Sequence, residues 1–160
     1  CVIAGCRLFG GLEQKIKLWH RENEQSRKLE AIAGIGPMTA SAFVATVGDA
    51  KSFKNARQVP AWLGMLPRHE GTGGNVRMGK ISKRGDVYLR TLLIHGARAT
   101  IRHVERKPGP VDGWLRNLLA RRHKNIVTVA LAAKNARIAW ALLAHERGYQ
   151  RDYVSRSTAA

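Results

Sequence analysis

The strongest constraint on the fold is a run of apolar and small residues at helical spacing between Leu89 and Val104. The run comprises Leu89, Leu92, Leu93, Gly96, Ala97, Thr100, Ile101 and Val104. Residues three and four apart lie on one face of an α-helix, so the run predicts a long helix with one face in the core. Asp86 suits its N-cap. The opposite face is expected to be exposed and carries Arg90, His95, Arg98 and Arg102.

The flanking segments also favour helices. An amphipathic helix is predicted by Leu8, Leu12, Ile16 and Trp19, and the polar stretch HRENEQSRK after it is expected to leave the core or to continue a coiled-coil-like arm. Pro37 suits the first turn of a short apolar helix closed by Gly48. Beyond a break at residues 108–110, WLRNLLARRHK and the Ala-rich IVTVALAAKNARIAWALLAHERGYQ predict two more helices. Strand signals are weak, so the predicted fold class is mostly α.

The segment between the short apolar helix and the long helix has two parts. In KSFKNARQVPAWLGMLPRHEG, residues able to face a core are Phe53, Ala56, Val59, Trp62, Leu63 and Leu66. Pro60 and Pro67 are expected to bound a short helix. The following stretch HEGTGGNVRMGKISKRGD, residues 69–86, is rich in glycine and in cations and has no apolar run long enough for an element of its own. It therefore predicts a flexible, cationic loop.

The stretch IAGIGPMTASAF is typical of a helix-hairpin-helix motif. Its glycines would let backbone N–H groups at a helix N-terminus approach a phosphate. On this interpretation Gly34, Gly36 and Thr39 are candidate nucleic-acid contacts. A purely structural turn between two helices is the alternative.

The charge of the chain points to a polyanionic partner. Its 28 lysines and arginines and 11 acidic residues give a net charge of +17 and a pI near 11.1, far more than solubility requires. We expect no membrane association, because the sequence offers neither a basic amphipathic anchor nor an evident spanning segment. Cys1 and Cys6 are expected to be reduced thiols without a zinc site. The start at Cys1 rather than Met suggests a fragment.

The cationic loop could bind phosphates or take part in chemistry. Lys80, Lys83 and Arg84 would hold phosphates, but a P-loop is excluded because Ile81 occupies its Ser/Thr position. The acidic residues are too scattered for a self-contained two-metal nuclease. A hydroxyl nucleophile is the other route to strand cleavage, and Thr72, Ser82 and Tyr88 are suitably placed. Each also has a plain alternative, such as a turn hydroxyl for Thr72 or helix packing for Tyr88.

Several blocks in order carry a family resemblance. They are IAGIGPMTASAFVATVGDAKSF, QVPAWLGMLPR, GTGG, GKISKRGDVYLRTLLIHGARA and ALLAHERGYQRDYVS. Together they resemble the C-terminal transposase domain of the IS-one-ten class of insertion-sequence transposases, to which Piv-type invertases are related. The resemblance covers roughly Leu29 to Ser155. It implies the end of a connector helix at 1–28 and the transposase domain at 29–155. The remaining tail at 156–160 has no pattern and is expected to be disordered.

The resemblance implies a two-part recombinase. An N-terminal RuvC-like domain, absent from this chain, would bring carboxylates and Mg²⁺, while the C-terminal domain supplies a nucleophilic serine. Some members use a bridge RNA and act as oligomers. The implied partners are therefore DNA, a bridge RNA and further copies of the protein, in the bacterial cytoplasm at the nucleoid, and no cofactor or metal ligand is assigned to this domain.

Residue by residue, the family's serine follows an LxPR block and directly precedes glycine. Here Leu66-Pro67-Arg68 leads to Thr72-Gly73, so Thr72 is the implied nucleophile, with Ser82 as the fallback. Threonine departs from the family's serine, and its β-methyl restricts χ1. The full set of predicted nucleic-acid contacts is Gly34, Gly36, Thr39, Arg68, Gly73, Gly74, Arg77, Lys80, Lys83, Arg84, Arg90 and Arg98. The alternative function is a non-catalytic helix-hairpin-helix module that binds DNA or RNA.

Overall fold

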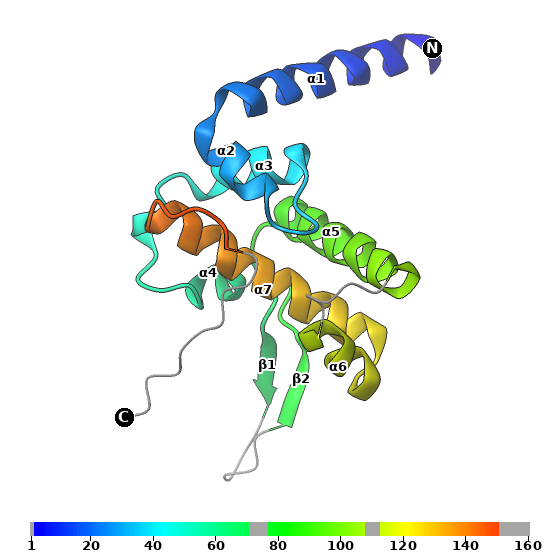
Figure 1. The fold of residues 1–160 in the computed structure, drawn as a ribbon, viewed down its shortest axis with the longest axis vertical. Helices are drawn as coiled ribbons and strands as arrows, with labels where there is room; N and C mark the ends of the chain where they lie inside the picture. Colours follow the sequence, from blue (N-terminus) through cyan, green and yellow to red (C-terminus); the bar gives the residue numbers. More distant parts are fainter. Residues whose placement is uncertain (1, 71–76, 108–112, 151–160) are drawn as a thin grey trace.

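A computed structural model describes residues 2–70, 77–107 and 113–150 of the chain. Within these residues the fold is helical, with one small antiparallel sheet (Figure 1). The elements are α1 (Val2–Glu22), α2 (Glu24–Glu30), α3 (Pro37–Val47), the 3-10 helix η1 (Ala50–Ser52), α4 (Gln58–Trp62), β1 (Pro67–Glu70), β2 (Arg77–Ile81), α5 (Val87–Arg106), α6 (Gly113–Arg121) and α7 (Lys124–Ala144). The mostly α prediction is confirmed.

The predicted helix ends agree with the structure at α3 and α5. Pro37 is the first residue of α3, and Gly48 follows its end with a φ of 59°. Asp86 caps α5, since its carboxylate accepts a hydrogen bond of 2.5 Å from the Leu89 backbone N–H. Local sequence decides these ends, because the first backbone N–H groups of a helix have no partner within the helix. Proline at the first position removes one such donor, and a carboxylate at the N-cap accepts a hydrogen bond from another.

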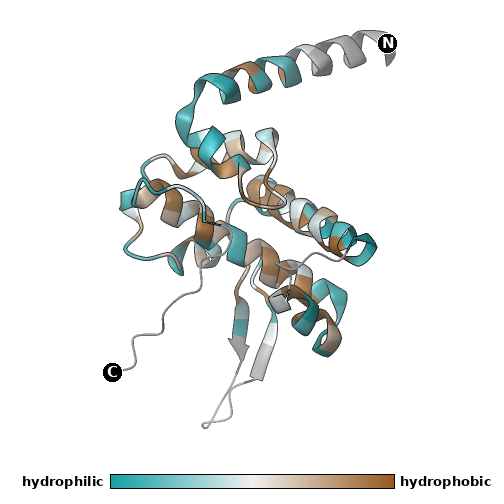
Figure 2. Cartoon of the chain, viewed as in Figure 1, coloured by the Kyte–Doolittle hydropathy of each residue, from teal (hydrophilic) through white to brown (hydrophobic). Residues whose placement is uncertain are grey.

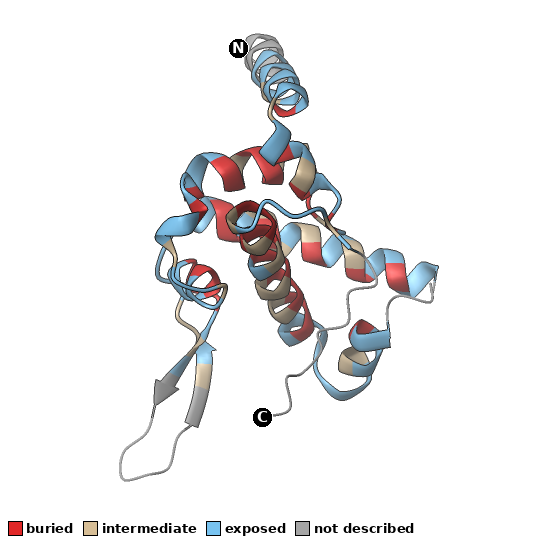
Figure 3. Cartoon of the chain, turned by 60° about the vertical axis from the view of Figure 1, so that its left-hand side comes forward, coloured by how far each residue is buried: buried red, intermediate tan, exposed pale blue. Residues whose placement is uncertain are grey.

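Helices α5 and α7 form the centre of the core. Every fourth or so residue of α5 is buried, namely Leu89, Leu93, Ala97, Ile101 and Val104, as their spacing predicts. The alanines of α7 that let the helices approach closely are Ala132, Ala136 and Ala139, each fully buried. The apolar sides of these helices face inward in Figure 2, and buried residues gather on α3, α5 and α7 in Figure 3.

Helix α7 is long and apolar enough to cross a membrane by length and composition. However, 56% of its most apolar stretch is buried inside the structure. It contacts α2, α4, α5 and α6. Its apolar character is thus accounted for by its position at the centre of a helical core.

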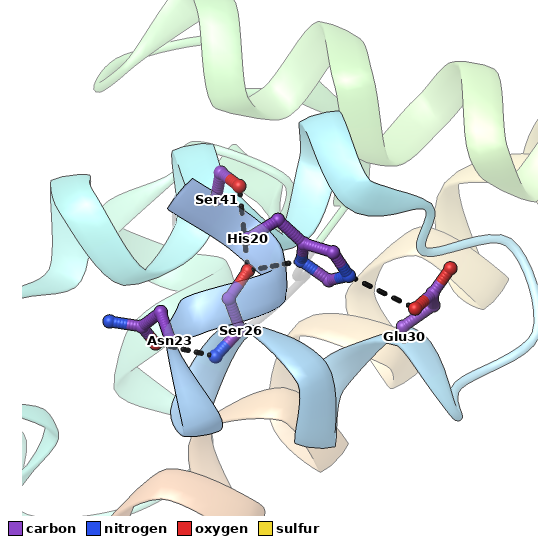
Figure 4. A network of polar contacts seen from close by, with 5 residues as sticks. All are labelled: His20, Asn23, Ser26, Glu30 and Ser41. Carbon is purple, nitrogen blue, oxygen red and sulfur yellow. Dashed lines mark hydrogen bonds and ion pairs between the residues drawn. The ribbon is translucent and has the colours of Figure 1, made fainter. Parts of the chain in front are cut away.

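The junction of α1 and α2 differs from the sequence-based expectation. The polar stretch after Trp19 does not leave the core: His20 and Ser26 are buried, and α2 packs against α3. Figure 4 shows why these polar groups tolerate burial. The Nδ1 atom of His20 shares a hydrogen bond of 2.7 Å with Ser26 Oγ, and its Nε2 atom lies 3.0 Å from Glu30 Oε2. The earlier part of α1 extends away from the body, with Leu12 exposed.

The prediction for residues 53–66 is correct in part. Val59 and Leu63 are fully buried as expected, but Trp62 and Leu66 are 40% and 42% exposed. Pro60 lies inside α4 rather than at its boundary. The helix spans only five residues, so helical spacing cannot be extended through it to Leu66.

The prediction that residues 69–86 contain no element of their own is wrong. Strands β1 and β2 pair in antiparallel register, with Pro67 opposite Ile81 and Glu70 opposite Arg77. An irregularity in the register lies between Pro67 and His69. Neither strand shows a clear alternation of apolar and polar residues, because the hairpin does not cover the core and its backbone hydrogen bonds hold it together instead.

Candidate nucleic-acid interface

The base of the hairpin is a close crossing of two chain segments. A Cβ atom on Gly64 would lie 1.9 Å from the Arg84 carbonyl oxygen, and one on Gly85 would lie 1.9 Å from the Trp62 carbonyl oxygen. Both glycines also have positive φ, 69° and 105°. Only glycine meets both demands, so these two residues fix the position from which the hairpin leaves the body.

Backbone hydrogen bonds continue the hairpin down to this crossing. The Ser82 N–H donates to the Leu66 carbonyl at 2.9 Å, and the Lys83 N–H donates to the Gly64 carbonyl at 3.0 Å. Ser82, the fallback nucleophile, is half-buried at this base. Thr72, Gly73 and Gly74 belong to residues 71–76, which lie outside the described residues and connect β1 to β2 in the sequence.

Exposed cations line the hairpin and its base. The exposed side chains are those of Arg68, Lys80, Lys83 and Arg84. Nη2 of Arg68 also donates 3.2 Å to the Ser82 carbonyl across the hairpin. The only acidic residue from 79 to 86 is Asp86, which caps α5. The structure thus brings together four predicted phosphate contacts; the side chain of a fifth, Arg77, is not described.

Lys83 has an unusual backbone conformation for a residue with a side chain. Its φ is 55°, in the left-handed region that favours glycine. Such strain costs about 1–2 kcal/mol and tends to be found at functional sites. At Lys83 it accompanies the tight turn from β2 into the crossing at Gly85.

Two large aromatic side chains also reach the surface near the crossing, of which Trp62 was expected to face the core. Trp62 packs edge-on against Phe53, with ring centroids 5.5 Å apart, yet remains 40% exposed. Tyr88, in the first turn of α5, is 58% exposed rather than packed. Their signal is weak in the sequence, because burial of a single aromatic residue depends on neighbours far along the chain.

Two predicted contacts on α5 lie apart from this cluster. Arg90 was expected on the exposed face, but this is wrong: its side chain is 8% exposed, and Nη1 donates 3.0 Å to the Leu63 carbonyl. The buried guanidinium thereby ties α5 to the end of α4. Arg98 is exposed, but the helical rise places it about 16 Å along α5 from Val87.

The turn between α2 and α3 was predicted to bind phosphate through its glycines. Gly34 has a φ of 89°, and a Cβ there would lie 2.7 Å from the Gly96 carbonyl oxygen. The close approach of the turn to α5 therefore explains why residue 34 is a glycine. Thr39 is buried, whereas Gly36 stands at the N-cap of α3 with open space around it. Residues 31–36 connect α2 to α3; that this segment is a helix-hairpin-helix motif in contact with nucleic acid stays a prediction.

The Ser26, His20 and Glu30 side chains are linked in the order of a hydrolytic triad. Ser26, however, has no exposed surface, and its Oγ also lies 3.4 Å from Ser41 Oγ. A substrate cannot reach it, so the network is structural. Among the described residues, no group of three or more His, Cys, Asp or Glu side chains could hold a metal ion.

A surface hollow lies beside η1, away from the hairpin. Its lining includes Asp49, Lys51 and Glu146. Its two carboxylates and one ammonium group give the hollow a negative charge, which would repel a phosphate. The exposed cations of the hairpin are therefore the better candidate for an interface with a polyanion.

Comparison with known proteins places the chain beside a family of transposases. Residues 26–109 match a family described as transposase IS116/IS110/IS902. The chain is 53% identical over 139 residues to a probable family 20 transposase from Pseudomonas aeruginosa. It is 44% identical over 142 residues to the transposase for insertion sequence element IS1111A from Coxiella burnetii.

These alignments cover 87% and 89% of this chain but 41% and 39% of the two relatives. The chain therefore spans about two fifths of the length of these relatives. The pilin gene-inverting protein of Moraxella bovis is 31% identical over 72 residues, which cover 44% of this chain and 22% of that protein.

Proposed function

The chain belongs to the transposase IS116/IS110/IS902 family, and we propose that it is the part of an insertion-sequence transposase that binds nucleic acid and presents a hydroxyl nucleophile to a DNA strand. The exposed cations of the β1–β2 hairpin carry this proposal. Arg68 and Lys80 lie on the strands themselves, and Lys83 and Arg84 lie at their base. Such an arrangement suits a sugar–phosphate backbone because each cation can neutralise a phosphate.

The proposed nucleophile is Thr72, which the sequence places between the two strands. Its Oγ1 would attack the phosphorus of a DNA strand, forming a phosphothreonine bond as the bond to one sugar oxygen breaks. The hydroxyl proton leaves as the new bond forms, and the released sugar oxygen takes up a proton. The hairpin cations would stabilise the negative charge that develops on the phosphate oxygens.

No group of three or more His, Cys, Asp or Glu side chains that could hold a metal ion is found among the residues that the structure describes. We propose that Mg²⁺ is held by carboxylates of an N-terminal domain outside this chain. The further partners proposed for the full-length protein are DNA, a bridge RNA and additional copies of the protein. Its proposed location is the bacterial cytoplasm, at the nucleoid.

A non-catalytic module that binds DNA or RNA is the second candidate. The exposed Trp62 and Tyr88 beside the hairpin favour it, because aromatic side chains and cations together bind nucleic acid without any chemistry. This alternative requires the same cations but no hydroxyl. The two candidates therefore differ only in what happens at residue 72.

The deciding experiment uses the full-length protein with Mg²⁺ and the DNA ends of its element, together with any RNA that copurifies. Denaturing gels and mass spectrometry would detect a DNA–peptide adduct. We expect an adduct on the peptide that contains Thr72, loss of that adduct in Thr72→Ala, and unchanged binding in the same variant.

Thr72→Ser serves as the matched control because it keeps the hydroxyl and removes the β-methyl. An adduct at wild-type level in Thr72→Ala would refute the assignment to Thr72. Binding without an adduct in the wild type, and with an adduct in Thr72→Ser, would indicate a protein that retains binding but has lost cleavage.

A further inference from the structure

Helices α6 and α7 form a second cationic region that no motif in the sequence identified. Between Gly113 and His145 there is no aspartate or glutamate. The same stretch contains the basic residues Arg116, Arg121, Arg122, Lys124, Lys134 and Arg137. Lys124 is paired with Glu105 of α5, with Nζ 2.7 Å from the carboxylate. Positive charges without acidic neighbours repel one another, and a bound polyanion would reduce this repulsion.

The two helices are joined by residues 122 and 123 alone, so the chain turns back on itself. This turn brings the start of α6 against the middle of α7. The Lys134 ammonium group lies 4.2 Å from the centroid of the Trp114 ring. A cation at this distance from an indole face is attracted by the ring's electrons, so the contact fixes the orientation of Trp114.

Trp114 offers the rest of its ring to solvent. It is 43% exposed even though Lys134 covers part of it. Partial burial of the Lys134 side chain, and then the positive charge of Arg137, lower the pKa of its ammonium group. Lys134 is thus half-buried beside the ring, while a large part of Trp114 remains accessible to solvent.

Exposed residues, together with the half-buried Lys134, extend from Trp114 along both helices. On α6, Trp114, Asn117 and Arg121 stand at positions i, i+3 and i+7 and share one face. The Arg121 Nε–H donates 3.1 Å to the Asn117 carbonyl. On α7, Ile126 and Lys134 are eight residues apart and also share a face. We call these residues, with Arg122 and Arg137, the α6–α7 surface.

We propose that the α6–α7 surface is a second nucleic-acid contact, at which Trp114 stacks on an unpaired base while Arg121, Arg122 and Arg137 neutralise the flanking phosphates. An exposed aromatic ring among cations is the combination that binds single strands, because every base has a face on which an aromatic ring can stack. A duplex hides those faces within its own stack. The surface is therefore suited to an unpaired strand, of DNA or of RNA.

A second copy of the chain fits this surface less well, since two surfaces that each carry an excess of positive charge repel one another. The position of the surface also favours a shared nucleic acid. In Figures 1 and 3, α6 and the β1–β2 hairpin both lie at the end of the molecule opposite α1. One nucleic acid can therefore contact both. The inference rests on the proposed function in one respect, namely that the partner is a nucleic acid.

The test measures the affinity of the full-length protein for a labelled single-stranded oligonucleotide and for a duplex of the same sequence. We expect Trp114→Ala to weaken single-strand binding about tenfold and duplex binding less than twofold. Trp114→Phe should retain most of the affinity because it keeps an aromatic face. Single-strand binding should quench tryptophan fluorescence in the wild type, with clearly less quenching in Trp114→Ala.

The cations are tested by Arg121→Gln with Arg122→Gln, which should lower the slope of log affinity against log salt by about 1.4 for a single strand. Lys15→Gln with Arg27→Gln is the matched control: it removes the same charge from exposed positions on α1 and α2. That control should leave the slope nearly unchanged. Trp19→Ala is the corresponding aromatic control on α1.

Five results would overturn the inference. Equal effects of the Arg121 and Arg122 substitutions and of the Lys15 and Arg27 substitutions would show that only total charge matters. Affinity and quenching at the wild-type level in Trp114→Ala would exclude stacking. A changed oligomeric state of that variant with unchanged affinity would also exclude stacking, and would instead indicate an interface between copies. If Arg68→Gln with Lys80→Gln abolishes binding while Arg121→Gln with Arg122→Gln has no effect, the second contact is refuted but the proposed function is not. Absence of binding in the wild type would refute both.

Discussion

Close backbone contacts made by glycines fix the segments that carry the proposed interface. Gly64 and Gly85 allow the chain to cross itself at the base of the hairpin. Gly34 and Gly96 allow the turn between α2 and α3 to touch α5, where a Cβ on Gly96 would lie 1.8 Å from the Gly34 carbonyl oxygen. In the sequence, Gly34 resembled a phosphate-binding glycine, but the structure gives it a role in packing.

Gly96→Ala tests this packing role. It is expected to lower the stability of the protein, whereas the same substitution at an open position of a helix raises it. Alanine in an open helical position stabilises by about 1 kcal/mol relative to glycine. At Gly96 the new methyl group would collide with rigid backbone, so we expect a net loss of about 1–3 kcal/mol in the free energy of unfolding. Urea unfolding measures it.

Gly11→Ala is the control, since a Cβ at Gly11, within α1, would meet nothing within 4 Å. That substitution should stabilise α1 or leave the unfolding midpoint unchanged. A Gly96→Ala protein as stable as Gly11→Ala would contradict the close contact between the turn and α5.

Lys83 offers a second test, because it separates backbone strain from charge. Lys83→Gly removes a left-handed residue with a side chain, and we expect it to leave stability unchanged or raise it by up to about 1 kcal/mol. Lys80→Gly, in strand β2, should instead destabilise by about 0.5–1 kcal/mol. Both remove one hairpin cation and should weaken nucleic-acid binding alike. Equal losses of stability in thermal unfolding would show that Lys83 is not strained.

Among the elements, the junction of α1 and α2 departs furthest from its sequence pattern. A stretch that is polar in sequence is held inside the fold by hydrogen bonds among His20, Ser26 and Glu30 (Figure 4). Asn23 caps α2 by accepting from the Ser26 N–H at 2.8 Å. Buried polar groups are tolerated where each finds a partner, so this network sets the direction in which α1 leaves the body.

Ser26→Ala should therefore destabilise by about 1–3 kcal/mol, because it leaves Nδ1 of the buried His20 without its partner. Urea unfolding and limited proteolysis between α1 and α2 would measure the effect. Ser52→Ala is the control: its Oγ donates to the Asp49 carbonyl at an exposed site, where we expect a change below about 0.5 kcal/mol. Similar small effects at both serines would argue against a structural role for the network.

Charge is distributed unevenly over the whole molecule. In α1 and α2, cations have acidic neighbours, and hydrogen bonds from Lys17 and Lys28 lower the pKa of Glu13 and Glu24. In α6 and α7 no acidic residue is present. The end opposite α1 therefore carries the cations best able to meet a polyanion.

This distribution predicts a steep dependence of nucleic-acid binding on salt for the full-length protein. On duplex DNA, log affinity should fall linearly with log salt, with a slope of about −0.9 for each phosphate neutralised. Arg68→Gln with Lys80→Gln should lower the magnitude of that slope by about 1.8. Titrations at several salt concentrations measure this slope. Affinity that stays constant from low to high salt would contradict the proposed function in both its catalytic and its binding forms.

The sequence by itself determined the helices of the core, several of their ends and the class of partner implied by charge. Helices α3, α5, α6 and α7 follow from spacing and caps, because their hydrogen bonds join residues four apart and their buried faces recur with a fixed period. Net charge needs no structure at all. Family membership was likewise indicated by blocks in the sequence and confirmed by comparison.

The tertiary structure alone decided the hairpin, the burial of Arg90 and His20, and the contact of Trp114 with Lys134. Each depends on partners distant in sequence: β1 on β2, Arg90 on the Leu63 carbonyl, and α6 on the middle of α7. A polar side chain is buried or exposed according to whether the fold supplies its hydrogen-bond partner. Local pattern does not record that partner, so only the packed chain separates cations that hold the fold together from cations that remain available for a ligand.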